Sequence, residues 1–155
     1  MWSPPVFFST TQRTQNMSIY SKFGTDAQKE KEGVRIVLDV NPDGTECAFY
    51  IARKGGRNSE YAAAVKRHFE ANRIELSKKQ PSEEAATQFM CRVFADAIVK
   101  GWDNLQGPDG KDIPYNKDTC EIVLTDLPDL LTEIDSHAEN INNFKNDSWA
   151  ADEKN

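Results

Sequence analysis

The chain has 155 residues, of which 38% are hydrophobic. This length is enough for one domain with its own hydrophobic core but short for two. The formal net charge of −6 argues against a protein whose main function is to bind nucleic acid, because such binding needs a positive electrostatic field opposite the phosphates. No apolar run approaches the roughly 20 residues needed to cross a bilayer. We therefore expect a soluble protein that has neither nucleic acid nor a membrane as its partner.

The two ends of the chain differ in composition from its middle. Residues 1–16 combine adjacent prolines, a brief aromatic run and polar residues, and we predict that they form a disordered extension. Met17 follows at once, so we interpret these residues as lying upstream of the true start; the alternative is a flexible arm that orders on a partner. Residues 17–145 are predicted to form a single α+β domain, and residues 146–155 a flexible polar tail that carries Trp149.

The first regular elements are two alternating segments rich in β-branched residues. VRIVLDV, residues 34–40, is followed by the turn residues NPDGT and then by a second alternating segment, residues 46–54. This pattern predicts a β-hairpin. Because a hairpin alone is marginally stable in water, we expect it to pack on helices or to extend into a small antiparallel sheet.

Two helices are predicted next. Apolar residues recur at helical spacing over residues 58–76, with Asn58 or Ser59 as the N-cap, and this stripe weakens toward its end. The clearest amphipathic stripe follows Ser82, a candidate N-cap, and runs to a predicted helix end near Gly101 and Trp102. We interpret this second segment as the core helix.

Two further helices complete the predicted fold. Asn116 is a candidate N-cap for a short helix, and Pro128 introduces a last helix whose inner face extends from Leu127 to Phe144. The fold class that follows is α+β and mainly helical, with an N-terminal β-hairpin or small antiparallel sheet packed against about four α-helices.

The stretch GWDNLQGPDGKDIPYN, residues 101–116, is rich in carboxylates, amides, glycines and prolines, as ligand loops and turns are. It lacks oxygen ligands at the first and third positions of a calcium loop, where Leu105 and Gly107 stand, and it lacks the Lys-Ser/Thr pair of a phosphate loop. PDGK instead has the composition of a tight turn, with Gly110 free to take a positive φ. We interpret the stretch as a turn that connects two helical regions.

No residue chemistry in the chain indicates an enzyme. The three cysteines are widely spaced and are interpreted as buried small hydrophobes, and the two histidines have no partner at ligand spacing. RKGGRN, residues 53–58, could bind an anion at a helix start, but we favour a flexible link between strand and helix. We therefore predict no catalytic residues, no cofactor and no metal site.

Three segments resemble the tail assembly chaperones of long-tailed, siphovirus-like bacteriophages. They are SKFGTDAQKEKEGV before the hairpin, YIARKGGRNSEYAAAV between strand and helix, and VKGWDNLQGPDGKDIPYNKDTCEIVLTDLPDLLTEI followed by NF. None of the three is a catalytic motif. The resemblance rests on their order and spacing, and together they span most of residues 18–145. This chain would be the short form, made without the programmed frameshift that often adds a further domain.

The resemblance implies a non-enzymatic function in the host cytoplasm. Such chaperones bind the tape measure protein, keep it soluble, help to recruit tail tube subunits, in part through the frameshifted long form, and are absent from the mature virion. It also implies possible self-association along the tape measure. Two alternatives from other classes stay open, namely a structural tail completion or head–tail joining protein and a small acidic inhibitor or nucleic-acid mimic.

A helix-lined groove is the expected binding mode for a long amphipathic partner. The core helix and the last helix could line such a groove. The candidate contact residues are Phe89 and Phe94 on the first, Leu131 and Ile134 on the second, and Trp149 in the tail. For the four residues on the helices, ordinary core packing is the preferred alternative.

Overall fold

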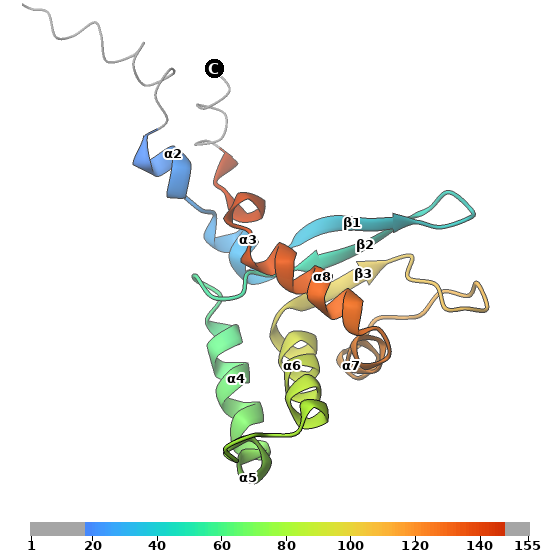
Figure 1. The fold of residues 1–155 in the computed structure, drawn as a ribbon. Coiled ribbons are helices and arrows are strands. Elements are labelled where there is room, and N and C mark those ends of the chain that lie inside the picture. The colour runs from blue at the N-terminus through green and yellow to red at the C-terminus, as the bar shows by residue number, and fades with distance from the viewer. Residues whose placement is uncertain (1–17, 148–155) are drawn as a thin grey trace, which may run out of the picture.

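The computed structural model describes residues 18–147, so the predicted extension, Trp149 and most of the predicted tail lie outside the described part of the chain. The described chain forms a three-stranded antiparallel sheet in the order β1-β2-β3, together with a larger set of helices (Figure 1). The predicted α+β, mainly helical fold is confirmed.

The predicted hairpin is present. It consists of β1 (Val34–Val40) and β2 (Glu46–Ile51), and a bulge late in β1 shifts the register of the pair. The turn between them closes with a hydrogen bond of 2.8 Å from the Asn41 backbone N–H to the Thr45 carbonyl oxygen. Gly44 takes a φ of 88° in this turn, which explains the glycine there.

The core helix is shorter than the sequence predicts, and its expected end forms a third strand. α6 (Glu83–Ala97) stops before β3 (Val99–Asp103), which pairs with β2 and places Trp102 beside Phe49. The prediction that the helix continues to Gly101 and Trp102 was therefore wrong. A β-branched residue followed closely by glycine propagates a helix poorly, and pairing with β2 favours the extended form.

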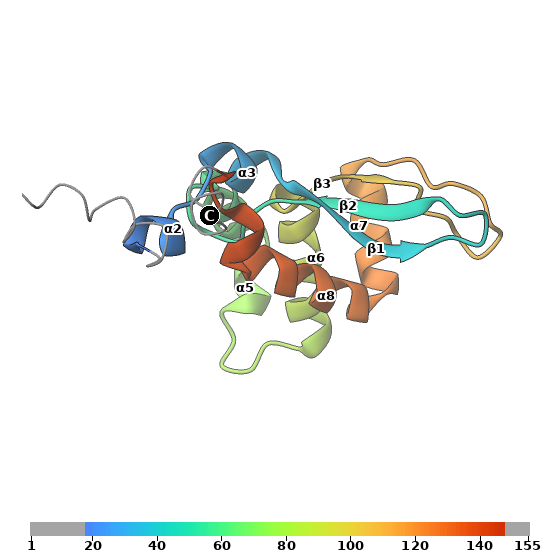
Figure 2. The same ribbon diagram turned by 90° about the horizontal axis from the view of Figure 1, so that it is seen from above.

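The helices cover the sheet face that carries Phe49 and Trp102. α6 packs mainly against two other helices, α4 and α7 (Figure 1), whereas α8 packs against β2, α7 and the final 3-10 helix, and Figure 2 shows α8 and α7 on the same side of the strands. The described helices besides α6 are α2 (Ile19–Phe23), α3 (Ala27–Glu32), α4 (Ser59–Ala71), α5 (Arg73–Leu76), α7 (Lys117–Asp126), α8 (Pro128–Glu139) and the 3-10 helix η1 (Ile141–Phe144).

Two of the predicted N-caps are confirmed, and one residue at a cap position has a different role. The Ser82 side chain accepts a hydrogen bond of 3.1 Å from the backbone N–H three residues later, and Asn116 does the same at 2.8 Å. Asn58 occupies the N-cap position of α4 without capping it. Its buried amide group donates to the carbonyl oxygens of Arg53 and Ala97, at 2.9 and 3.1 Å, and so ties α4 to α6.

Two helices end earlier than predicted. α4 ends at Ala71, because Asn72 leaves helical geometry with a φ of −125° and a ψ of 30°, and the chain restarts as the short α5. The last helix, α8, ends at Glu139, and the remaining apolar positions up to Phe144 form η1. In both places the helix ends at an asparagine, Asn72 after α4 and Asn140 after α8.

The predicted PDGK turn is confirmed, although it links β3 to α7 and not two helices. The Gly107 N–H donates to the Lys111 carbonyl oxygen at 2.9 Å, and Gly110 takes a φ of 78°. The indole N–H of Trp102 donates to the Ile113 carbonyl oxygen at 2.7 Å, which holds the segment after the turn against the sheet. This segment is therefore structural.

A single buried cluster joins the sheet to the helices. The three cysteines are free and buried, as predicted, and burial raises the pKa of the Cys120 thiol to about 12. Among the described residues, no helix is long and apolar enough to span a membrane. The largest fully buried hydrophobic side chains are Phe49, Ile51, Val93, Phe94, Ile98, Val99, Leu124, Ile134 and Phe144.

Candidate functional site

The structure separates the candidate contact residues into two groups. Phe94 and Ile134 are fully buried, so their side chains offer no surface to a partner in this structure. Phe89 and Leu131 are only partly buried and pack against the edge of the core. Trp149 lies outside the described residues.

The two helices expected to line a groove have different main neighbours. α6 packs against α4 and α7, and α8 packs against β2, α7 and η1. α7 contacts both helices, and the partly exposed side chains of Phe89 and Leu131 pack against the same buried cluster. α6 also packs against α4 and α5, and these two helices carry exposed apolar residues.

α5 lies at the end of α4 that is farthest from the sheet (Figure 1), and two exposed apolar residues belong to this part of the chain. Phe69 is 36% exposed in the last turns of α4, and Ile74 is 85% exposed in α5. Phe89 is partly buried on the first half of α6, the helix that packs against α4 and α5. We call this region, residues 69–78 together with Phe89, the helical tip.

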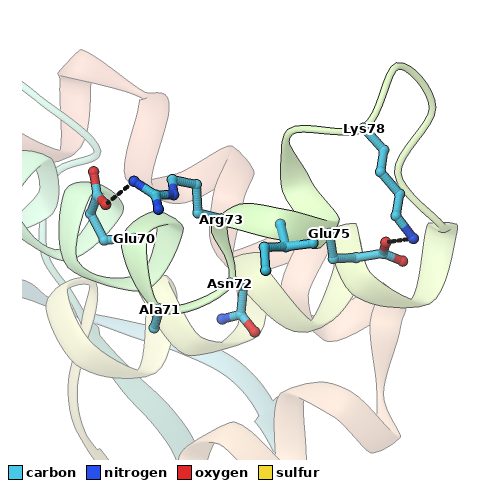
Figure 3. A pocket seen from close by; sticks show the side chains of 7 residues that line it. Glu70, Ala71, Asn72, Arg73, Glu75 and Lys78 are labelled. Atoms are coloured by element: carbon cyan, nitrogen blue, oxygen red, sulfur yellow. Dashed lines mark ion pairs between the residues drawn. The ribbon is translucent and has the colours of Figure 1, made fainter.

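A surface pocket of about 430 Å³ lies at the helical tip, where α4 ends and α5 begins. Figure 3 shows an ion pair at each side of it, Glu70 with Arg73 and Glu75 with Lys78. The hydrogen bond from Lys78 lowers the pKa of the Glu75 carboxyl, which keeps it charged. Ile74 belongs to the lining, so an exposed apolar side chain stands among charges of both signs. Such a surface can bind an amphipathic segment through apolar contacts and a polar rim.

In the sequence, this surface was indicated only by the weakening of the apolar pattern toward the end of the helix predicted over residues 58–76. Beyond Phe69 the apolar spacing is lost, and Asn72 then turns the chain. The exposure of Ile74 was not predicted, since the sequence placed it within a continuous helix. A large apolar residue just after a helix-breaking asparagine is the signal that could have indicated it.

The RKGGRN loop is an anion-binding site that the chain fills by itself. The anion is the carboxylate of Glu30 on α3, which is only 1% exposed. It accepts a hydrogen bond of 2.7 Å from the Arg53 guanidinium and one of 2.8 Å from the Arg57 backbone N–H. Burial alone would raise the pKa of Glu30, but hydrogen bonds from Thr25, Arg57 and Arg53 outweigh it and lower the pKa. The preferred interpretation, a link between strand and helix, missed this buried pair.

The histidine on α4 takes part in a second charged cluster, which joins three helices. Asp96 on α6 contacts the His68 ring at 2.8 Å, the Lys117 ammonium at 2.9 Å and the Arg67 guanidinium. Burial acts to raise the pKa of Asp96, yet the hydrogen bonds from Lys117, Arg67 and His68 lower it far below its usual range. The cluster therefore fastens α4 and α7 to α6.

Replacing Asp96 with asparagine is expected to lower the free energy of unfolding by about 1–3 kcal/mol, because the Arg67 guanidinium and the Lys117 ammonium lose their common anion, although both stay largely in solvent. Since the folded pKa of Asp96 is lowered, its contribution is present at neutral pH and is lost as the pH falls through that pKa. Urea denaturation at pH 7 measures the change. Asp112→Asn, in the exposed turn after β3, is the control; equal losses in both variants would contradict this role.

Metal ligation and thiol reactivity can be examined directly for the described residues. No three His, Cys, Asp or Glu side chains in that range are placed to hold a metal ion. Burial raises the pKa of the Cys47 and Cys91 thiols as well as that of Cys120. The described thiols are therefore held in the neutral form, which is the unreactive one.

A comparison with protein families finds one matching model, which is described as a YdaY prophage protein and covers residues 56–155. The matched part begins within the RKGGRN loop and includes the helical layer from α4 to η1, β3 and the helical tip; β1 and β2 precede it. No curated protein and no solved structure matches the chain.

Proposed function

The chain belongs to the YdaY prophage protein family, and from this premise we propose that it is a phage tail assembly chaperone that binds the tape measure protein during tail construction. The resemblance of residues 18–145 to such chaperones supports this proposal, and the family places the chain among phage-derived proteins. The tape measure protein is long and helical, so its chaperone needs a surface that accepts an amphipathic helix.

The observation that carries the proposal is the helical tip. The exposed Ile74 lines the pocket together with the members of two ion pairs, an arrangement that matches the apolar face and charged flanks of an amphipathic helix. The tip also lies within the part of the chain that the family model matches. Phe89 remains a candidate contact at its edge, and Leu131 remains one on α8.

The proposed activity is non-enzymatic. Two carboxylates with little exposure to solvent, Glu30 and Asp96, are engaged in intrachain ion pairs with Arg53 and Lys117. This engagement supports a binding protein over a catalyst. Recruitment of tail tube subunits, a frameshifted long form, residence in the host cytoplasm and absence from the virion are further parts of the same proposal.

Changing Ile74 to aspartate is expected to weaken tape measure binding by about tenfold or more, since it puts a charge in the centre of the apolar contact. The fold should tolerate it within about 0.5 kcal/mol because the side chain is 85% exposed. The measurement is pull-down of the tape measure protein encoded beside this gene, co-expressed with the full chain. Ile122→Asp on α7, 60% exposed, is the matched control and should bind normally. Equal binding by both variants would remove the helical tip from the proposal.

Mass spectrometry of purified phage particles separates the proposed chaperone from a structural tail protein. A chaperone leaves before the tail is finished, so the chain should be present in the infected or induced cell and missing from the particle. Recovery of the chain in particles at the stoichiometry of a tail component would contradict the chaperone role and favour a tail completion or head–tail joining protein.

A further inference from the structure

α2 turns its apolar side toward solvent and its small polar side toward the rest of the chain. Ile19 is 66% exposed and Phe23 is 58% exposed, whereas Ser21 is 4% exposed. Ile19 and Phe23 are four residues apart, so their side chains share one face of the helix, and Ser21 lies on the opposite one. Figure 1 and Figure 2 both show α2 standing apart from the sheet and from the larger helices. A helix in a folded domain normally buries its apolar face, so a further segment is expected to cover this one.

The C-terminal end of the described chain runs antiparallel to the residues that follow α2. Thr25 and Lys145 form an antiparallel bridge, and the Asn146 backbone N–H donates to the Gly24 carbonyl oxygen at 3.2 Å. The Lys145 ammonium also donates to the Ser21 carbonyl oxygen, within α2, at 3.0 Å. As the residue numbers rise on one side they fall on the other, so this direction carries the end of the chain toward α2.

The residues that come next in the sequence have the apolar character that the exposed face of α2 calls for. Asp147, the last described residue, is held by an ion pair of 2.8 Å with Lys29 on α3. Trp149 comes two residues later, so its Cα atom is at most about 7 Å from that of Asp147. Residues 149–151, WAA, are the apolar part of an otherwise polar end, and an indole ring is large enough to contact Ile19 and Phe23 together.

We propose that Trp149 packs on the face of α2 formed by Ile19 and Phe23, so that the end of the chain covers the helix that begins the described domain. The anchor at Asp147 holds the segment beside the helix, and the contact is therefore intramolecular. A short tether gives such a contact a high effective concentration. A second copy of the chain, or another protein, would have to compete with it for the same face.

The charges beside the two surfaces are complementary. Lys22 is the one charged residue of α2, and Asp152 and Glu153 come directly after the apolar residues 149–151. Complementary charges favour one orientation of the segment on the helix. The proposal gives Trp149 an intrachain role in place of the partner contact predicted from the sequence, and it does not depend on tape measure binding.

Hydrogen exchange of the full chain measures this contact, because a covered α2 opens less often and its amides exchange more slowly. The amides to follow are those of Lys22 and Gly24, whose N–H groups donate within α2 at 3.0 and 2.7 Å. Trp149→Ala should lower their protection by about fivefold or more, whereas Trp149→Phe keeps an aromatic ring and should retain most of it. The amide of Cys120 in α7 is the internal reference and should not change. Unchanged protection of α2 in Trp149→Ala would overturn the proposal.

A double-mutant cycle identifies the surface that Trp149 contacts. Phe23→Ser should lower the same protection, and adding Trp149→Ala to it should have no further effect, because the contact has already been lost. Losses that add in full would overturn the proposal. The competing occupant of the face is the part of the chain before α2, so a protein that begins at Met17 is measured as well. If that protein loses protection and Trp149→Ala does not, the face belongs to the preceding residues and the proposal is wrong.

Discussion

Replacing Glu30 with glutamine is expected to lower the free energy of unfolding by about 3 kcal/mol, the loss typical of removing one partner from a buried ion pair. The carboxylate is 1% exposed and holds both the Arg53 guanidinium and the Arg57 backbone N–H. A neutral amide leaves the guanidinium without a counter-charge and turns an N–H donor toward another donor. Chemical denaturation at pH 7 measures the loss.

The control for this variant lies on the same helix. Glu32→Gln changes an exposed carboxylate two residues away and should alter stability by less than about 0.5 kcal/mol. If both variants lose the same amount, the buried pair with Arg53 is not what holds the RKGGRN loop in place.

The pH dependence of the same variant is a separate test of the buried charge. Glu30 has a lowered pKa in the folded protein, so the native chain gains stability from it above its ordinary value of 4.5 and loses that gain as the pH falls through the folded pKa. The difference in unfolding free energy between native and Glu30→Gln proteins should therefore be largest near neutral pH and shrink in acid. A difference that grows on acidification would contradict a charged Glu30.

Replacing Phe94 with alanine is expected to cost about 3–5 kcal/mol, because a fully buried aromatic side chain leaves a cavity in close-packed surroundings. Phe94 belongs to the cluster that joins α6 to the sheet, and the Lys54 ammonium lies 5.9 Å from the centre of its ring. Thermal and urea denaturation measure the loss.

Phe89→Ala is the matched control for Phe94→Ala. It makes the same change in the same helix, five residues earlier, where the side chain is only partly buried. We expect Phe89→Ala to lose less stability than Phe94→Ala. If the helical tip binds the tape measure protein, Phe89→Ala should also weaken that binding more than Phe94→Ala does, measured on the soluble protein of each variant. Equal destabilisation by the two changes would contradict the division of this stripe into core and surface.

The elements that the sequence predicts well are those encoded by neighbours in the chain. The hairpin follows from alternation and a five-residue turn, and the caps at Ser82 and Asn116 follow from one side chain and the helix after it. The PDGK turn is equally local. Each of these depends on contacts within a few residues, which a pattern in one sequence can carry.

The features that the sequence did not predict depend on partners far along the chain. β3 exists because β2 offers an edge to residues that otherwise continue an apolar stripe, and the pairing joins Trp102 to Phe49. Glu30 is one carboxylate in a charged segment, and only the fold brings it to the RKGGRN loop. The helical tip follows from the break at Asn72, which local spacing marked only as a weakening stripe.

The most direct test of the chaperone role is the solubility of the tape measure protein from the same gene neighbourhood, expressed with and without the full chain. We expect the tape measure protein to remain in the soluble fraction only when this chain is present, with several copies of the chain recovered per tape measure molecule. The proposed function would be contradicted if this chain leaves the solubility of the tape measure protein unchanged and is not recovered with it in a pull-down.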